Sequence, residues 1–177
     1  MIFINSNSIN DIFWTFYLIK RSFLLDETKT QYFFAYIGIA SALVFANLGA
    51  SYGTAKSAVG ISSLAVIDHT KIFQGLIPII MAGILGIYGV IIAVIAGSQV
   101  KGLGTNMTEA EGYKYLGAGL ACGLSSLAAG LAIGVAGDAG VRAYAQTDDI
   151  FVGMILILIF AEAIGLYGLI VSIIMIF

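Results

Sequence analysis

Charged residues are scarce in this chain. Lysine, arginine, aspartate and glutamate make up 10% of its 177 residues, and the formal net charge is −2. Nucleic acid is therefore not expected as a partner, because binding it requires clustered basic side chains. A soluble core of any size is excluded as well, since hydrophobic residues reach 60% and the mean hydropathy is +1.02. These values are typical of an integral membrane protein.

Other residue types are nearly absent. The one cysteine, Cys122, lies in an apolar run, so the chain cannot form an internal disulfide. The one histidine, His69, has only Asp68 beside it, so we expect a solvated loop residue and no metal site. The sequence has no nucleophile–base set and no phosphate-binding loop. We therefore expect no catalytic residue and no cofactor on this chain.

Four apolar runs are long enough to cross a bilayer as helices, which takes about 20 residues each. They cover residues 32–57, 72–98, 113–144 and 150–177. A polar connector beginning at Gly60 follows the first run, and a loop over 99–112 follows the second. Pro78, the one proline, is expected to bend the second span slightly. The sequence thus predicts an all-α membrane protein.

The N-terminal extension, residues 1–30, differs from these runs. Its apolar residues recur at helical spacing, but Lys20 and Arg21 interrupt it too early for an ordinary span. We expect a helix that lies in the membrane interface, and a short extra span is the alternative.

Small residues form seams at four-residue spacing in the third span. One seam begins with Gly119 and Gly123, and a second passes through Gly130 and Gly134. Such seams let helix backbones approach closely in lipid, so these glycines are predicted packing sites. A similar seam of small residues runs along the first span. Near the end of the third span, Asp138 and Arg142 are four residues apart, which predicts a local ion pair.

The last run holds one ionisable side chain, Glu162. At about 1.5 Å per residue, it lies roughly 18 Å from either end, close to the bilayer midplane. A central acid costs roughly 2.5–3.5 kcal/mol to insert, so it marks a functional site. Because lipid penalises the carboxylate and not the neutral acid, we expect Glu162 to hold a proton in lipid and release it beside water or a cation. A merely structural hydrogen-bonding residue is the alternative.

The two halves of the chain are related by one ungapped offset. Identical residues aligned by this offset are Ala42 with Ala121, Leu48 with Leu127, Ala50 with Ala129, Ile80 with Ile159, Ala82 with Ala161, Gly86 with Gly165, Tyr88 with Tyr167 and Gly89 with Gly168. The chain is therefore two tandem helical hairpins, residues 31–98 and 113–177, in the same orientation. The small residues on the first helix of each hairpin suggest a ring with these helices inside. Where the second copy has Glu162, the first has Gly83.

Tyr88 lies five residues beyond Gly83, or about 7–8 Å along a helix. Its phenol would therefore reach a glutamate on an adjacent helix, and buried phenols usually find a hydrogen-bond partner. We predict Tyr88 as a partner of Glu162. Packing near the interface is the equally weighted alternative.

Four stretches resemble the proteolipid (c) subunits of vacuolar-type proton-pumping ATPases. They are LGASYGTAKS at 48–57, PIIMAGILGIYG at 78–89, GDAGVR at 137–142 and FVGMILILIFAEAIGLYG at 151–168. The resemblance implies a membrane rotor ring of proteolipids in which Glu162 carries the proton. It implies a neighbouring stator subunit, whose arginine makes the acid release its proton, and a peripheral sector that hydrolyses ATP and is reached through the rotor stalk. It also implies a vacuolar or other acidic endomembrane, with the loops after the first and third spans in the cytosol.

Three other functions compete with this one. A sister c″-type proteolipid of the same ring has an extra N-terminal span, but its essential acid lies in the first repeat, where this chain has Gly83. A sodium pump would need several oxygen ligands around the acid, and the third span has neither Asn nor Gln. A structural or channel-forming proteolipid would not need Glu162.

Overall fold

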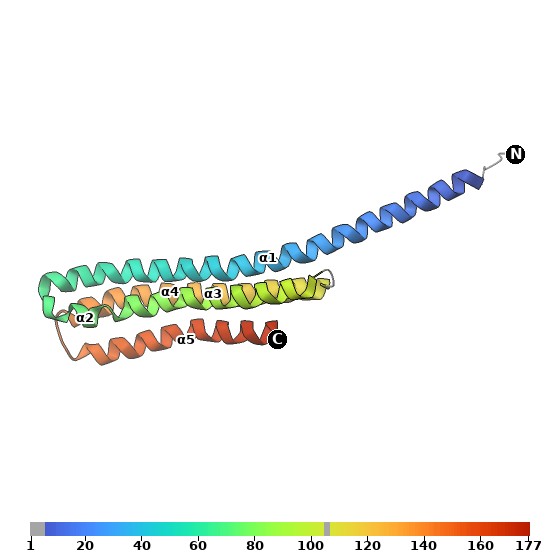
Figure 1. The fold of residues 1–177 in the computed structure, drawn as a ribbon. Coiled ribbons are helices and arrows are strands. Elements are labelled where there is room, and N and C mark those ends of the chain that lie inside the picture. Colours follow the sequence, from blue (N-terminus) through green and yellow to red (C-terminus); the bar gives the residue numbers. More distant parts are fainter. Residues whose placement is uncertain (1–5, 105–106) are drawn as a thin grey trace.

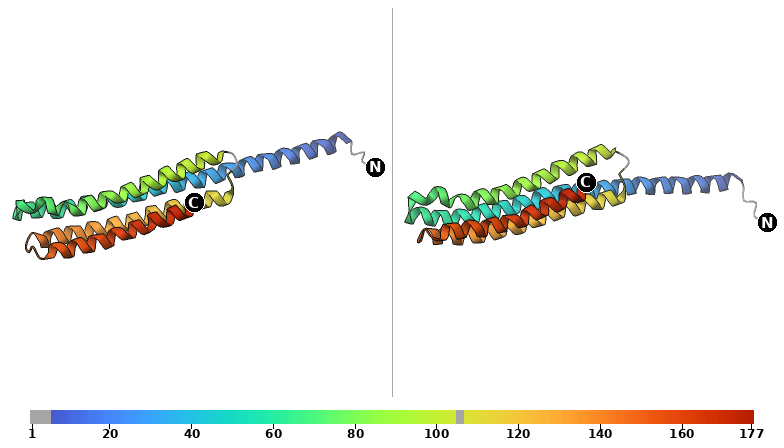
Figure 2. Two further views of the ribbon diagram at one scale, coloured as in Figure 1. Left: turned by 60° about the horizontal axis from the view of Figure 1, so that its bottom comes forward. Right: turned by 90° about the horizontal axis from the view of Figure 1, so that it is seen from below.

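The computed structural model describes the chain from Ser6 to Phe177 except for residues 105–106, and describes side chains from Thr30 onward. In chain order the elements are α1 (Ser6–Ile67), the 3₁₀ turn η1 (His69–Lys71), α2 (Ile72–Gly75), α3 (Ile77–Leu103), α4 (Glu109–Tyr144) and α5 (Ile150–Ile176). Four helices are long and apolar enough to cross a membrane, and they run side by side (Figures 1 and 2). The described residues include no strand, which confirms the all-α prediction.

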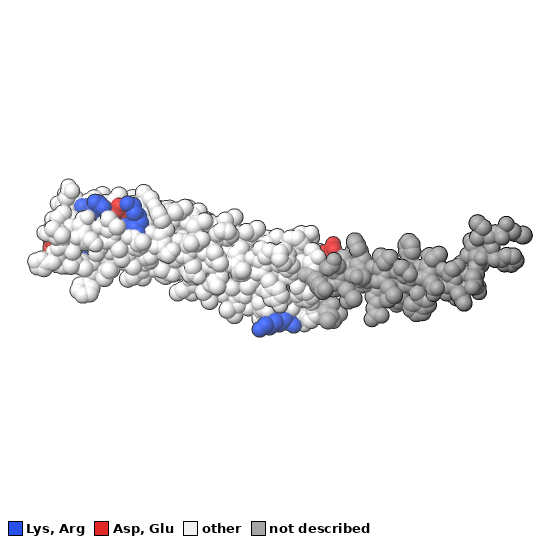
Figure 3. All heavy atoms as spheres, turned by 90° about the horizontal axis from the view of Figure 1, so that it is seen from above, with Lys and Arg blue, Asp and Glu red and all other residues white. Residues whose placement is uncertain are grey.

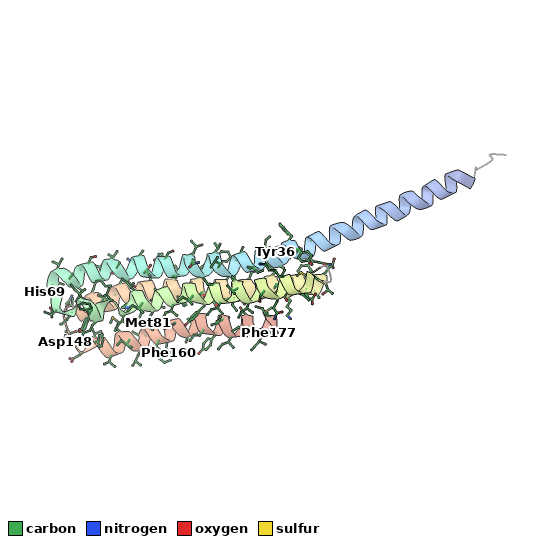
Figure 4. All side chains as sticks on the ribbon, in the orientation of Figure 1. Tyr36, His69, Met81, Asp148, Phe160 and Phe177 are labelled. Carbon is green, nitrogen blue, oxygen red and sulfur yellow. The ribbon has the colours of Figure 1, made fainter. Side chains whose placement is uncertain are left out.

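The two hairpins have the same orientation, as the repeat predicts. Helices α1 and α4 run in one direction, and α3 and α5 return in the other (Figure 1). The connector after α1 and the connector after α4 therefore share one end of the bundle, where Figure 4 places His69 and Asp148. The C-terminal Phe177 lies toward the opposite end. Each hairpin thus contributes one helix of each direction.

Helix α1 continues past the predicted end of the first span. We expected a connector from Gly60, but the helix extends to Ile67. The serines that suggested a loop are satisfied inside the helix: Ser62 and Ser63 donate to the carbonyls of Ala58 and Val59 at 2.9 and 3.3 Å. The chain turns only after these residues.

Asp68 ends the first span and caps the following turn. Its Oδ1 accepts hydrogen bonds from the Thr70 backbone N–H at 3.0 Å and from the Thr70 hydroxyl at 2.6 Å. These bonds stabilise the carboxylate, so they hold the pKa of Asp68 below its usual value. This capped turn replaces most of the predicted connector.

The N-terminal part of α1 is continuous with the first span, since one helix of 62 residues covers both (Figure 1). The placement of this extension in the membrane depends on side chains outside the described part of the chain. Its interfacial position therefore stays a prediction.

Pro78 starts a helix and does not bend one, contrary to expectation. The turn at Leu76 separates α2 from α3, and Pro78 lies in the first turn of α3. An N–H in the first turn has no acceptor within the helix, so proline loses nothing there. At the other end, α3 closes on Gly104, whose φ of +53° is a conformation that glycine readily adopts.

The loop between the hairpins is shorter than the predicted 99–112, because α3 ends at Leu103 and α4 begins at Glu109. A capping box starts α4. Thr108 Oγ1 accepts from the Glu111 N–H at 3.4 Å, and Glu111 Oε2 accepts from the Thr108 N–H at 2.7 Å.

Glycine backbones form the contact between α1 and α4. A Cβ added at Gly130 would overlap the backbone of Gly49, and one added at Gly119 would overlap the backbone of Gly38. At Gly123 an added Cβ would lie 2.6 Å from the Ser41 carbonyl oxygen. Because nothing larger than hydrogen fits at these positions, α1 and α4 touch along their backbones.

The repeat is visible in the packing within each hairpin. A Cβ at Gly89 would lie 2.5 Å from the Cβ of Ala46, and a Cβ at Gly168 would lie 2.5 Å from the Cβ of Ser125. Ala46 and Ser125 are themselves counterparts in the repeat. The second helix of each hairpin therefore packs on the first in the same register.

Charged side chains occupy the two ends of the bundle on the face shown in Figure 3, and the long middle of that face carries none. Large apolar side chains are exposed along the helices, among them Phe160 at 73% and Ile174 at 71%. An apolar exposed band between charged ends fits a bilayer, which confirms an integral multi-pass membrane protein.

Candidate functional site: a carboxyl group in mid-membrane

Glu162 lies near the middle of the last helix, which begins at Ile150 and ends at Ile176. At about 1.5 Å per residue, it is roughly 18 Å from the first of these residues and roughly 21 Å from the second. Glu162 is partly buried, whereas its neighbours Phe160 and Ile164 are exposed. The acid thus lies at the edge of the helix contact, at the position along the helix predicted from the sequence.

The phenol of Tyr88 is hydrogen bonded to this acid. Its hydroxyl donates to Glu162 Oε1 at 3.0 Å, which joins α3 to α5. Tyr88 is 9% exposed, so its ring is held in the core while the hydroxyl reaches the acid. The structure therefore brings together the two residues named from the sequence.

Two glycines position this pair. A Cβ at Gly165 would lie 2.6 Å from Leu85 Cδ2 and 3.7 Å from Tyr88 Cδ2, so glycine lets α5 approach the Tyr88 side of α3. A Cβ at Gly89 would lie 2.6 Å from the Ala42 carbonyl oxygen, so glycine also lets α3 approach α1. These close approaches set how α3, which carries Tyr88, packs against α5 and α1.

The core that holds Tyr88 is apolar. Leu158 and Ala161 of α5 and Leu85 of α3 are buried in it. In the described part of the chain, no ion pair involves Glu162. The acid has two states with satisfied hydrogen bonds: a carboxylate that accepts from the phenol, and a neutral acid that donates to the phenol oxygen. A heavy-atom separation of 3.0 Å fits both.

The repeat counterpart of the acid is an open position. Gly83 is exposed, and a Cβ built on it would meet no atom within 4 Å. Packing within the chain therefore leaves room for a side chain at Gly83. The second hairpin carries a carboxyl group at this place in the repeat, and the first hairpin carries nothing.

A cluster of charged side chains, of which the sequence predicted one pair, lies toward the end of the bundle that holds the connectors after α1 and α4. Arg142 Nε donates to Asp138 Oδ1 at 2.7 Å, which confirms the expected ion pair. The structure adds Lys56 of α1, whose Nζ lies 3.1 Å from Asp138 Oδ2. Local spacing along α4 could identify Arg142 but not Lys56, because the contact of Lys56 with Asp138 depends on how α1 packs on α4.

The connectors after α1 and α4 are joined by a polar network that the sequence did not reveal. Lys71 Nζ lies 2.6 Å from Asp148 Oδ1 and 3.5 Å from Asp68 Oδ2. It also lies 5.1 Å from the ring centroid of Tyr144, whose hydroxyl donates to Gln74 Oε1 at 2.6 Å. These contacts connect the two hairpins at that end of the bundle.

Comparisons with known proteins agree with this arrangement. The family profile of the ATP synthase C subunit matches twice, at residues 37–96 and 116–175. A V-type proton ATPase 16 kDa proteolipid subunit of Chrysotila carterae is 58% identical over 149 residues, which are 82% of this chain and 91% of that protein. The V-type proton ATPase 16 kDa proteolipid subunits c of Ascaris suum and Homo sapiens are 55% and 52% identical over 143 residues. These residues are 81% of this chain in both cases, and 89% and 90% of those proteins.

Proposed function

Because the chain belongs to the ATP synthase C subunit family, and within it to the c-type proteolipids of V-type proton ATPases, we propose that Glu162 binds and releases the transported proton in mid-membrane. The chain is a membrane subunit of the rotor of a V-type proton pump. In the proposed mechanism it carries no active site of its own, and ATP is hydrolysed by a separate peripheral sector.

The observation that supports this proposal is the hydrogen bond between Tyr88 and Glu162. An acid at this depth is costly to insert, and an unpaired carboxylate would be costlier still. The phenol supplies one partner, which suffices for a neutral acid. The site thus suits a group that crosses lipid in its protonated form.

The proton cycle then needs two environments. Against lipid, the neutral acid donates its proton to the Tyr88 oxygen. Beside a cation, the carboxylate is favoured, the proton leaves, and the phenol turns to donate to the Glu162 oxygen. We propose an arginine of the stator as that cation, with rotation bringing each Glu162 past it.

The proposed partners are other proteolipids in a homo- or hetero-oligomeric ring, the stator, the stalk subunits that lead to the peripheral sector, and membrane lipid. The proposed location is a vacuolar or other acidic endomembrane. A proton is favoured over sodium because a hard cation takes several oxygen ligands, whereas the Glu162 carboxyl is hydrogen bonded to one phenol among the described side chains.

Substitution of Glu162 by glutamine tests the proposal. Glutamine keeps the size and hydrogen bonding but cannot carry a proton, so rings should assemble while vesicle acidification is lost. Glu109→Gln, an exposed acid at the start of α4, is the matched control and should acidify normally. Normal acidification by a complex whose rings contain only the Glu162→Gln chain would overturn the proposal.

A further inference from the structure

Two cations share one carboxylate in the groove between α1 and α4. Lys56 Nζ lies 3.1 Å from Asp138 Oδ2, and Arg142 Nε lies 2.7 Å from Asp138 Oδ1. The side chains of Lys56 and Arg142 are 40% and 47% exposed, whereas that of Asp138 is 13% exposed. Two positive charges and one negative charge leave this cluster with a net charge of +1. Its positive groups are therefore the accessible ones.

These ion pairs leave most of the hydrogen-bond donors of the cluster unused. Arg142 contacts the carboxylate through Nε, and within the described part of the chain its two terminal nitrogens make no hydrogen bond or ion pair. The ammonium group of Lys56 has further N–H donors besides the one directed at Asp138. A guanidinium fork and an ammonium group are the side chains with which proteins bind phosphate groups. The cluster is thus suited to a phosphate.

The cluster lies at the depth at which the phosphates of a bilayer begin. A Cβ at Gly165 would lie 3.5 Å from the Cβ of Ala129, so these residues are level with each other. Because α4 and α5 run in opposite directions, Glu162 is level with about Ala132 (Figure 1). Arg142 lies ten residues beyond Ala132, or roughly 15 Å along the helix. With Glu162 at the midplane of a hydrocarbon core about 30 Å thick, Arg142 reaches its boundary.

An exposed apolar stripe runs from the cluster toward the middle of the membrane. Val135 and Leu131 lie seven and eleven residues before Arg142, which keeps all three on one face of α4, and both are exposed. The exposed ring of Tyr52 borders this stripe from α1, since a Cβ at Gly134 would lie 3.2 Å from Tyr52 Cδ1. The stripe and the cluster together have an apolar part in the core and a cationic part at its boundary.

We propose that this groove binds an anionic phospholipid, with its phosphate between Lys56 and Arg142 and an acyl chain along Val135 and Leu131. A lipid such as phosphatidylglycerol carries one negative charge, which cancels the net charge of the cluster. A zwitterionic lipid brings a further cation to two that are already present, so it binds more weakly. The inference places no role on the titration of Glu162.

Photo-cross-linking of assembled rings tests the site. The rings are placed in phosphatidylcholine nanodiscs that contain a minor share of photoactivatable phosphatidylglycerol, and mass spectrometry identifies the labelled peptides. Labels should fall on peptides that contain Lys56 or Arg142. Because each cation near a membrane surface contributes attraction, Lys56→Gln and Arg142→Gln should each lower this labelling roughly fivefold. Lys56→Arg keeps the charge and should retain it.

A further variant separates a lipid site from an ion pair that is only structural. Asp138→Asn breaks the same contacts as Lys56→Gln but raises the net charge of the cluster from +1 to +2, so labelling should rise. An ion pair that only holds the helices together predicts the same effect for both variants. Lys101→Gln removes an exposed lysine from the last turn of α3, at the opposite end of the bundle, and is the control with unchanged labelling.

Three results would overturn the inference. One is equal labelling by photoactivatable phosphatidylcholine and phosphatidylglycerol in the unchanged chain. Another is labelling that Lys56→Gln and Asp138→Asn lower alike in rings of normal size. The third is displacement of the probe by soluble glycerol phosphate, which would indicate a site for a free phosphate. The comparison of the two probes needs no variant, so it decides even where Lys56→Gln fails to form rings. None of these results bears on whether Glu162→Gln abolishes acidification.

Discussion

Tyr88 Oη lies 3.0 Å from Glu162 Oε1, and this bond joins the second helices of the two hairpins across 74 residues of sequence. The two side chains occupy different places in the repeat: Tyr88 has an identical counterpart in Tyr167, whereas Glu162 has none. The hydrogen-bonded pair is therefore made by both hairpins, although its acid comes from one of them.

Removal of the phenol hydroxyl should slow the pump without disrupting the ring. A hydrogen bond of about 1 kcal/mol corresponds to about a fivefold change in rate. In Tyr88→Phe the neutral acid loses its acceptor, so we expect slower acidification and slower carbodiimide labelling of Glu162. Tyr167→Phe is the control and should leave both unchanged. Unchanged labelling in Tyr88→Phe would assign Tyr88 to packing alone.

The glycines of α4 should differ in their tolerance of alanine. Gly130→Ala would drive a methyl group into the Gly49 backbone, which cannot yield. At Gly134 the nearest atoms to an added Cβ lie 3.1–3.2 Å away, so small shifts suffice. Overpacking typically costs about 1–3 kcal/mol, and we expect Gly130→Ala at the upper end of that range and Gly134→Ala at the lower.

Thermal unfolding of purified rings in detergent would measure this difference. Gly97→Ala is the neutral control, since a Cβ there meets nothing within 4 Å. Gly134→Leu, which adds a much larger group, should block assembly. Rings of normal size and stability with Gly130→Ala would show that the α1–α4 contact is not rigid.

The ion pair between helices α1 and α4 should contribute modestly. The side chains of Lys56 and Asp138 are 40% and 13% exposed, so solvent screens their attraction. A double-mutant cycle with Lys56→Met and Asp138→Asn should give a coupling energy of about 0.5–1 kcal/mol, decreasing with added salt. A coupling indistinguishable from zero at low salt would remove this pair from the account of the α1–α4 contact.

Loss of the capping box should destabilise the start of α4. Thr108→Ala removes the hydroxyl that accepts from the Glu111 N–H, and such caps are typically worth about 1 kcal/mol. Thr108→Ser keeps the hydroxyl and should behave like the unchanged chain. Amide hydrogen exchange would show the effect as faster exchange confined to the first turn of α4. Equal exchange in the alanine and serine variants would contradict it.

The sequence predicted those features that depend on local pattern. Apolar runs predicted the spans, one offset predicted two hairpins of the same orientation, and four-residue spacing predicted the pair of Asp138 and Arg142. The predicted bend at Pro78 was wrong. The sequence shows a proline in an apolar run, but it does not show the turn at Leu76 that puts Pro78 in the first turn of a helix. The Thr108–Glu111 spacing, by contrast, is a local sequence signature of the capping box that starts α4.

The remaining features depend on which helix faces meet. Nothing near Lys56 in the sequence indicates Asp138, and nothing near Tyr144 indicates Gln74, because each pair is formed by helix packing over long separations. Tyr88 was an exception. The repeat aligned it with the depth of the acid in the other hairpin, which put the acid within reach of its phenol, with packing as the equally weighted alternative.

The absence of an acid at Gly83 bears on how many protons each copy moves per revolution in the proposed mechanism. With Glu162 as the carrier, each copy moves one proton per revolution, whereas a chain with acids in both hairpins would move about twice as many. Because the free energy of ATP hydrolysis per revolution is fixed, moving half as many protons leaves roughly twice as much of that free energy for each proton. In the proposed mechanism, a chain with one acid therefore moves fewer protons per revolution than a chain with two, and it can pump them against a steeper proton gradient.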